Sequence, residues 1–131
     1  MADRLAIVEG LVRRWAAGDR TVREGEVHPD TELHTRLAAA AGEPYRGREG
    51  VERWGRDLGE LWEEMDLRVE DLIETGSGDV LVLSTAELRS RGSDVTFTQP
   101  IGWLFSFRDE LPARMDVFQS HAEAQKAAGL L

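Results

Sequence analysis

The sequence contains no cysteine, which excludes disulfide bridges, thiolate metal ligands and a cysteine nucleophile. Lysine occurs once, at Lys126, so that nearly all of the 16 basic residues are arginine. Acidic residues number 25, and the formal net charge is −9. This balance argues against a nucleic-acid partner or an anionic membrane surface, because phosphate binding requires clustered Lys and Arg.

Long apolar runs are also absent. No stretch approaches the roughly 18 apolar residues that a membrane-spanning helix needs. The N-terminal MADRLAIVEG carries acidic residues and lacks the apolar segment of a signal peptide. We therefore expect a cytoplasmic protein with no membrane partner, built as one domain over residues 1–131 around a single core.

Two further absences bear on cofactors. The three histidines are scattered, without a close pair of carboxylates, which is no metal-binding pattern. No glycine-rich loop lies between a predicted strand and a predicted helix to hold phosphate. We expect no metal, nucleotide or other cofactor.

The stretch around which the chain is organised is residues 95–107, VTFTQPIGWLFSF. Its odd-numbered side chains are mostly aromatic or aliphatic, which is typical of a long β-strand with one apolar face. Pro100 and Gly102 predict a bend or bulge. Gln99 is the only amide on the apolar face. This face is either plain core or the inner wall of a ligand pocket.

The other elements follow from periodicity and turn signals. An apolar stripe predicts a long helix over 48–65. Its Trp54 and Trp62 should pack on the inner face of the central strand. We expect Trp54 to line a cavity and Trp62 to be core. The remaining expected elements are helices over 3–17, 19–27 and 121–128, a loop over 38–45, and strands over 31–37, 67–75, 80–89 and 113–119.

Helices followed by a run of antiparallel strands predict an α+β fold with the helices on one face of the sheet. A curved sheet around a long helix leaves a conical cavity between them. The sheet face away from the helices should carry Leu72, Thr96, Thr98 and Leu104, a mixed surface suited to pairing with a second copy.

Six segments occur in an order that resembles a known family: RRWAAGD, VHPDTELH, YRGREGVERW, ETGSGDVLVLS, FSFRDE and FQSHAEAQKAAGL. On these, the chain resembles the nuclear transport factor 2-like superfamily, specifically its bacterial SnoaL-like branch. The resemblance implies a cone-shaped, cystatin-like α+β fold with a strongly bent antiparallel sheet wrapped around a long helix. It also implies an open-ended pocket and usually a homodimer through the outer sheet face. The family includes ketosteroid isomerases, limonene-type epoxide hydrolases, polyketide cyclases and non-catalytic binding domains, so fold does not decide function.

The positions that carry catalytic groups in those enzymes mostly hold other residues here. They correspond to Leu11, Thr35, Ser84, Ala86, Trp103 and Val117. His34 and Asp116 each lie one residue from such a position, and a shift of one residue in a strand sends a side chain to the opposite face. The family's acid is therefore either missing or displaced by a bulge.

Asp116 and His34 are the candidate catalytic residues. If Asp116 faces the pocket, burial beside Trp103 and Phe105 would raise its pKa and suit acid–base work; otherwise it is a carboxylate on the outer face. His34 is likewise either a group at the pocket mouth or a polar residue of the outer face. The candidate ligand-binding residues are Trp15, Thr35, Trp54, Gln99, Trp103, Phe105, Met115 and Val117.

Three functions compete. The first is a domain that binds a small, apolar, oxygen-bearing molecule, with Gln99 as polar anchor. The second is a cofactor-free isomerase, cyclase or epoxide-opening enzyme that uses Asp116 or His34 as acid–base. The third is a dimeric interaction module. The missing family catalytic residues favour the first.

Overall fold

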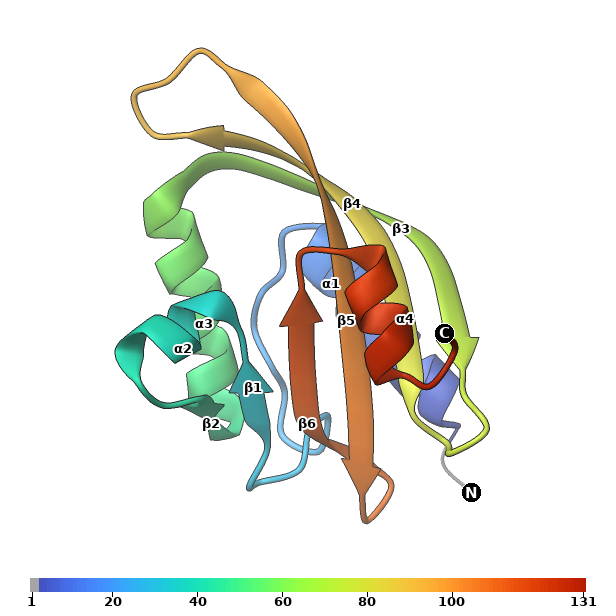
Figure 1. Ribbon diagram of the computed structural model, residues 1–131. Helices are drawn as coiled ribbons and strands as arrows, with labels where there is room; N and C mark the ends of the chain where they lie inside the picture. Colours follow the sequence, from blue (N-terminus) through green and yellow to red (C-terminus); the bar gives the residue numbers. More distant parts are fainter. Residues whose placement is uncertain (1–2) are drawn as a thin grey trace.

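The computed structural model describes residues 3–131. These form one six-stranded sheet in the order β2-β1-β6-β5-β4-β3, together with four helices (Figure 1). The elements in chain order are α1 (Arg4–Ala16), β1 (Glu32–His34), α2 (Arg36–Ala41), β2 (Tyr45–Arg46), α3 (Gly47–Leu61), β3 (Trp62–Glu74), β4 (Val80–Ser90), β5 (Thr96–Arg108), β6 (Leu111–Phe118) and α4 (His121–Ala127). The expected α+β class is confirmed.

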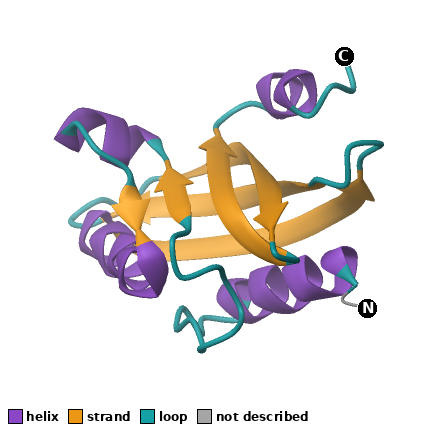
Figure 2. Cartoon of the chain, turned by 90° about the horizontal axis from the view of Figure 1, so that it is seen from below, coloured by secondary structure: helices purple, strands orange, loops and turns teal. Residues whose placement is uncertain are grey.

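The sheet is antiparallel except where β1 lies parallel to β6. Its long strands curve, and Figure 2 shows α1 and α3 on one side of the sheet and α4 on the other. We call the side covered by α1 and α3 the inner face and the side that carries α4 the outer face. No helix among residues 3–131 is long and apolar enough to cross a membrane.

The main core lies on the inner face. Val8 and Val12 of α1 repeat at helical spacing and are buried against the sheet, together with Val51 of α3. From β5, Trp103 and Phe105 enter this core with exposed fractions of 4% and 1%. The alternation of residues 95–107 therefore predicts the buried half of β5 correctly.

The other end of that stretch departs from the expectation. Val95 precedes β5 and is 68% exposed, and Phe97 is 43% exposed. The Phe97 ring instead packs edge-to-face on Trp62, with centroids 5.4 Å apart. Figure 1 shows this end of β4 and β5 reaching beyond α3, and no helix within residues 3–131 lies over it.

Two expected elements and the end of a third are wrong. Residues 19–27 are irregular, with a turn at Glu24 and Gly25, and form no helix. The expected loop over 38–45 contains most of α2, because four consecutive alanines favour a helix that Thr35 caps and Gly42 ends at a φ of 87°. The long helix ends at Leu61 and not Met65, because Trp62 already pairs with Ser90 in the sheet.

The outer face differs from the expected dimer surface. A bulge between Val69 and Asp71 turns Leu72 towards the main core. Leu104 packs under α4 with Leu81 and Ala124 in a second small core. The expected patch is therefore wrong for Leu72 and Leu104, while Thr96 and Thr98 are exposed; a homodimer stays a prediction.

Candidate functional site

Four aromatic rings from three elements meet at the centre of the inner face. Trp15 of α1 stacks on Trp54 of α3 with ring centroids 5.2 Å apart. Trp103 of β5 stands edge-on to both, at 5.7 and 5.5 Å, and stacks on Phe105 at 5.2 Å. Offset and edge-to-face pairs at these distances are favourable, so the cluster fixes the relative positions of α1, α3 and the sheet.

A cavity of about 110 Å³ opens beside these rings. It lies between α3, α2 and the inner face, and most of its lining is apolar. The lining residues are Trp15, Thr35, Arg36, Leu37, Trp54, Leu58, Trp62, Leu67, Leu88, Ile101, Trp103, Val117 and Gln119. An engineered apolar cavity of about 150 Å³ holds benzene, so this cavity suits about one ring, with larger groups extending out of its mouth.

Two hydrogen-bond donors in this lining lack acceptors. The indole Nε1 atoms of Trp15 and Trp103 are both buried and have no hydrogen-bond partner within residues 3–131. Buried polar groups nearly always have a partner, and an unmade hydrogen bond costs about 1–3 kcal/mol. Both tryptophans line the cavity and also a deeper void of about 20 Å³, so a molecule in the cavity that reached these nitrogens would supply the missing acceptor.

Arg20 lies against the other side of this cluster. Its guanidinium carbon lies 4.5 Å from the centroid of the Trp15 ring. Burial lowers the pKa of Arg20, and a guanidinium placed over an indole face is attracted to it. Arg20 thus helps to hold Trp15 in position without lining the cavity.

Arg36 and Thr35 lie at the mouth of the cavity. The Thr35 hydroxyl oxygen accepts a hydrogen bond from the Ala38 backbone N–H at 3.1 Å, which starts α2 at Arg36. Arg36 lines both the cavity and a larger groove of about 510 Å³ on the outer side, between α2, β6 and α4. The cavity and the groove therefore meet at α2.

His34 and Asp116 lie together in this groove and not in the cavity. They are register partners in the parallel pair of β1 and β6, one residue after Leu33 and Met115, which are buried in the main core. Strand side chains alternate, so His34 and Asp116 point to the outer face. Of the two alternatives for Asp116, the structure therefore shows the outer face, because β6 keeps its register from Arg114 to Phe118 and no bulge there restores the inward direction.

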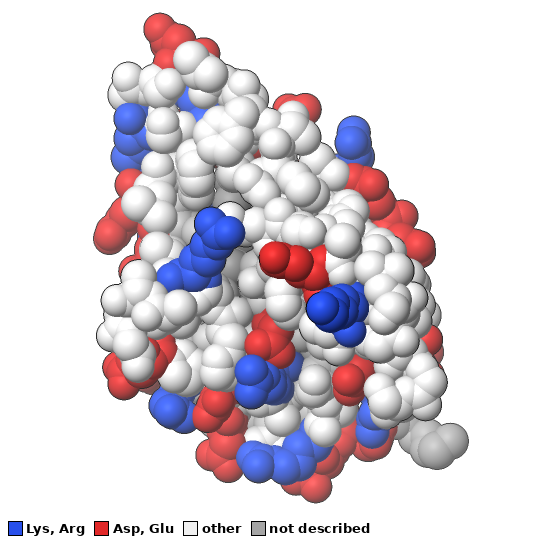
Figure 3. Space-filling view, in the orientation of Figure 1, with Lys and Arg blue, Asp and Glu red and all other residues white. Residues whose placement is uncertain are grey.

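Both groups in the groove are engaged by neighbours. The Arg114 guanidinium donates to Asp116 through Nε at 3.0 Å and Nη2 at 3.1 Å, and this hydrogen bonding raises the pKa of Arg114. His34 Nε2 lies 3.0 Å from a carboxylate oxygen of Glu32, and hydrogen bonds from His34 and Arg46 lower the pKa of Glu32. Figure 3 shows this face of the molecule, hollowed at its centre with acidic and basic side chains on either side. No group of three or more potential metal ligands gathers within residues 3–131.

Neither a protein-family model nor a curated protein matches the sequence. Solved structures do match. A nuclear transport factor 2-like protein from Burkholderia thailandensis E264 has a TM-score of 0.77 at 17% identity, covering 95% of this chain and 98% of that one. TerC, co-crystallized with polyporic acid, gives 0.72 at 20% identity, with 96% and 98% covered. A protein described as a SnoaL-like polyketide cyclase from Jannaschia sp. CCS1 gives 0.66 at 17% identity, with 98% and 92% covered.

The fold is nuclear transport factor 2-like. Further matches carry the descriptions ketosteroid isomerase-like and cystatin fold, so the expected fold is confirmed. At identities this low, the likeness concerns the fold alone. Fold does not decide function, so the function of this chain depends on its own site.

Within this nuclear transport factor 2-like fold, five of the sequence-predicted ligand-binding residues line the cavity: Trp15, Thr35, Trp54, Trp103 and Val117. Phe105 and Met115 lie deeper, beside a void of about 20 Å³. Gln99 does not line the cavity, because its amide Nε2 donates to the backbone oxygens of Gln119 and Pro100, at 3.0 and 3.2 Å. Its expected role as polar anchor is therefore wrong.

Some lining residues were not predicted. Ile101 shares the alternation of Trp103, and Leu58 belongs to the apolar stripe of α3, so both carried a signal. Trp62 lines the mouth and was expected to be core. Arg36 could not be recognised as a lining residue, because the sequence predicts a strand over 31–37 and not the helix that begins at Arg36.

Proposed function

We propose that this protein binds a small, largely apolar molecule that carries a hydrogen-bond acceptor, and that the molecule occupies the cavity beside Trp15, Trp54 and Trp103. The observation that carries the proposal is the pair of buried indole N–H groups without acceptors. A ligand oxygen could accept one of these hydrogen bonds. Binding would then remove the free-energy cost of a buried donor without an acceptor. The crystal structure of TerC with polyporic acid supports the proposal, since a protein of this fold accommodates a small molecule.

The lining favours binding over catalysis. Arg36 is its only charged residue, and no aspartate, glutamate or histidine belongs to it. Acid–base catalysis needs a group whose pKa lies near the operating pH, and an arginine does not supply one. Asp116, the strongest candidate from sequence, lies on the outer face with Arg114. We therefore do not propose acid–base chemistry in this cavity.

The proposal can be tested with two ligands of nearly the same shape, acetophenone and ethylbenzene, of which only the first has an acceptor oxygen. In ¹H–¹⁵N spectra, acetophenone should move the indole N–H resonance of Trp15 or Trp103 downfield, and ethylbenzene should not. Replacing Trp103→Phe should weaken acetophenone binding about tenfold, which corresponds to the loss of one buried hydrogen bond.

Trp62→Phe is the matched control. Trp62 also lines the cavity, but its indole nitrogen is not among the buried atoms that lack a partner. This variant should change the acetophenone affinity by less than about threefold. If neither ligand perturbs an indole resonance at millimolar concentration, the binding function is wrong.

A further inference from the structure

We infer that the ligand is a carboxylic acid whose ring enters the cavity and whose carboxylate is bound by Arg36 at the mouth. This inference rests on the proposed function and adds the charge of the ligand. Three observations carry it: the distribution of charge around the cavity, the absence of an ion pair at Arg36, and the position of Arg36 at the opening.

The charge of the cavity lining runs against the composition of the protein, whereas the outer groove that meets it at Arg36 also contains Glu43, Asp116 and Glu123. The chain has 25 acidic and 16 basic residues, yet the lining contains one arginine and no carboxylate. Two of the lining residues, Trp15 and Trp103, carry buried indole N–H donors without a partner, and the uncharged polar residues of the lining are Thr35 and Gln119. Two unpaired donors and one cation, with no carboxylate in the lining, are complementary to an acceptor and to negative charge, and they disfavour a cationic ligand.

Arg36 is one of several arginines without an ion pair, and it is the one that lines the cavity. Arg4, Arg14, Arg46, Arg89, Arg108 and Arg114 form ion pairs with carboxylates. Within residues 3–131, Arg36 is within 4.0 Å of no carboxylate oxygen and makes no side-chain hydrogen bond. Its guanidinium is therefore available to a ligand without breaking an existing pair.

The position of Arg36 sets how the ligand lies. Arg36 lines the cavity and also the outer groove, so its exposed side chain marks the opening between them. A guanidinium binds a carboxylate with two parallel hydrogen bonds. A carboxylate at the mouth keeps part of its hydration, while the attached ring packs against the tryptophans and an acceptor at its far end meets the indole N–H groups.

The test uses two probes that differ only in charge, 4-acetylbenzoate and 4-acetylbenzamide, titrated by tryptophan fluorescence and by the indole resonances. Both offer the acetyl oxygen to the indoles. The wild type should bind the benzoate at least about tenfold more tightly, since hydrogen bonds to charged groups contribute more than neutral ones. The preference should shrink in 0.5 M NaCl, because Arg36 is exposed.

Arg36→Gln should remove this preference and leave the affinity for the benzamide within about twofold of the wild type. Arg68→Gln is the control, because Arg68 is also exposed but lies on β3 away from the cavity lining; it should keep the preference. Equal binding of both probes by the wild type, or a preference that survives Arg36→Gln, would overturn the inference and leave the binding function standing. Failure of both probes to bind would overturn both.

Discussion

Gly102 of β5 and Ala124 of α4 meet on the outer face so closely that a Cβ on Gly102 would overlap the Ala124 side chain. The contact brings α4 down onto the sheet, where Ala124 joins Leu81 and Leu104 in the second core. The absence of a side chain at residue 102 therefore decides where the C-terminal helix packs, and with it how much of the outer face is covered.

The first prediction follows from this contact. Gly102→Ala should lower the free energy of unfolding by about 1–3 kcal/mol, the usual cost of overpacking. Gly10→Ala is the control, because a Cβ on Gly10 meets nothing within 4 Å and α1 should gain about 0.5–1 kcal/mol from it. Urea denaturation measures both. A double variant with Ala124→Gly should lose less than the sum of its single changes; additive losses would contradict the contact.

The second prediction concerns Tyr45, the only tyrosine in the chain. Its hydroxyl donates to Asp57 at 2.7 Å, and burial together with this bond raises the pKa of Tyr45 to about 12. Because the folded pKa lies above the unfolded value of about 10, the linked stability is fully present below pH 10 and is lost as the pH rises towards 12.

Absorbance near 295 nm reports the phenolate of this single tyrosine. Its titration midpoint should lie near 12 in the folded protein and near 10 in 6 M guanidinium chloride. Asp57→Asn should move the folded midpoint downward, since it removes the negative charge beside the hydroxyl. A folded midpoint at 10 would contradict the buried hydrogen bond.

The regular elements were predictable because their signals are local. The stripe of α3 and the alternation of β5 each repeat over a dozen or so residues, and Trp54 and Trp103 were placed correctly from them. The bounds were not predictable. Whether Trp62 belongs to the helix or to the strand is decided by its pairing with Ser90, which lies far along the chain.

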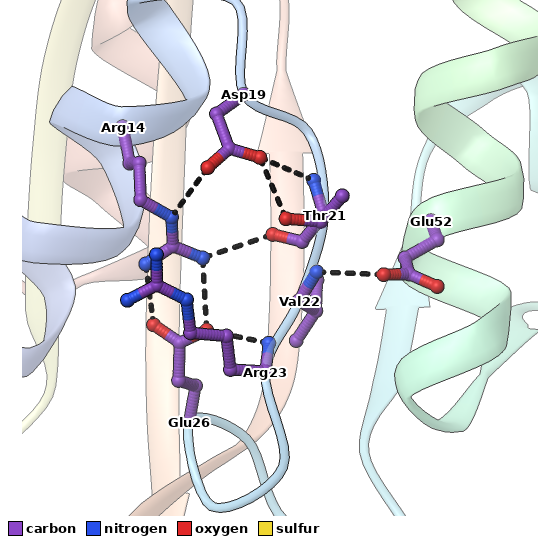
Figure 4. Close-up of polar contacts among 7 residues, drawn as sticks. All are labelled: Arg14, Asp19, Thr21, Val22, Arg23, Glu26 and Glu52. Atoms are coloured by element: carbon purple, nitrogen blue, oxygen red, sulfur yellow. Dashed lines mark hydrogen bonds and ion pairs between the residues drawn. The ribbon is translucent and has the colours of Figure 1, made fainter.

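The segment over 19–27 failed for another reason. The backbone here is held by side chains of α1, of α3 and of the segment itself, and not by helical hydrogen bonds. Arg14 of α1 donates to both carboxylate oxygens of Glu26, at 2.5 and 2.8 Å, and to the Thr21 carbonyl at 2.9 Å (Figure 4). Arg14 also forms an ion pair with Asp19 at 3.2 Å. From α3, Glu52 accepts the Val22 N–H at 2.8 Å.

The third prediction tests this network. Arg14→Gln should lower the free energy of unfolding by about 1–2 kcal/mol, somewhat below the usual range for charge-assisted hydrogen bonds because both partners are partly exposed. Arg13→Gln, on the same helical turn, should cost less than about 0.5 kcal/mol, because its pair with Glu9 is an exposed surface pair. The Arg23 backbone N–H donates to the Glu26 carboxylate that Arg14 holds, so hydrogen exchange should quicken at Arg23 in the first variant alone. Equal losses in both variants would show that Arg14 does not order the segment.

The site was half predictable. The alternation of apolar residues predicted the apolar lining of the cavity. It did not predict which polar side chains reach the cavity. Arg36 depends on α2, which begins where Thr35 caps it, and Gln99 is diverted by the backbone of Gln119. A hydrogen bond between distant parts of the chain leaves no periodic mark in the sequence.

The last prediction concerns Asp116. Because this residue points to the outer face and is bound by Arg114, Asp116→Asn should leave the affinity for acetophenone unchanged within about twofold. Unfolding should change by less than about 1 kcal/mol, since the Arg114 side chain is 54% exposed and exposed pairs contribute little. The same acetophenone titration, run on Trp103→Phe and on Asp116→Asn, compares the two affinities directly. A fall in acetophenone affinity after Asp116→Asn comparable to that after Trp103→Phe would mean that the ligand reaches the outer groove, and that the aromatic cavity is not the binding site.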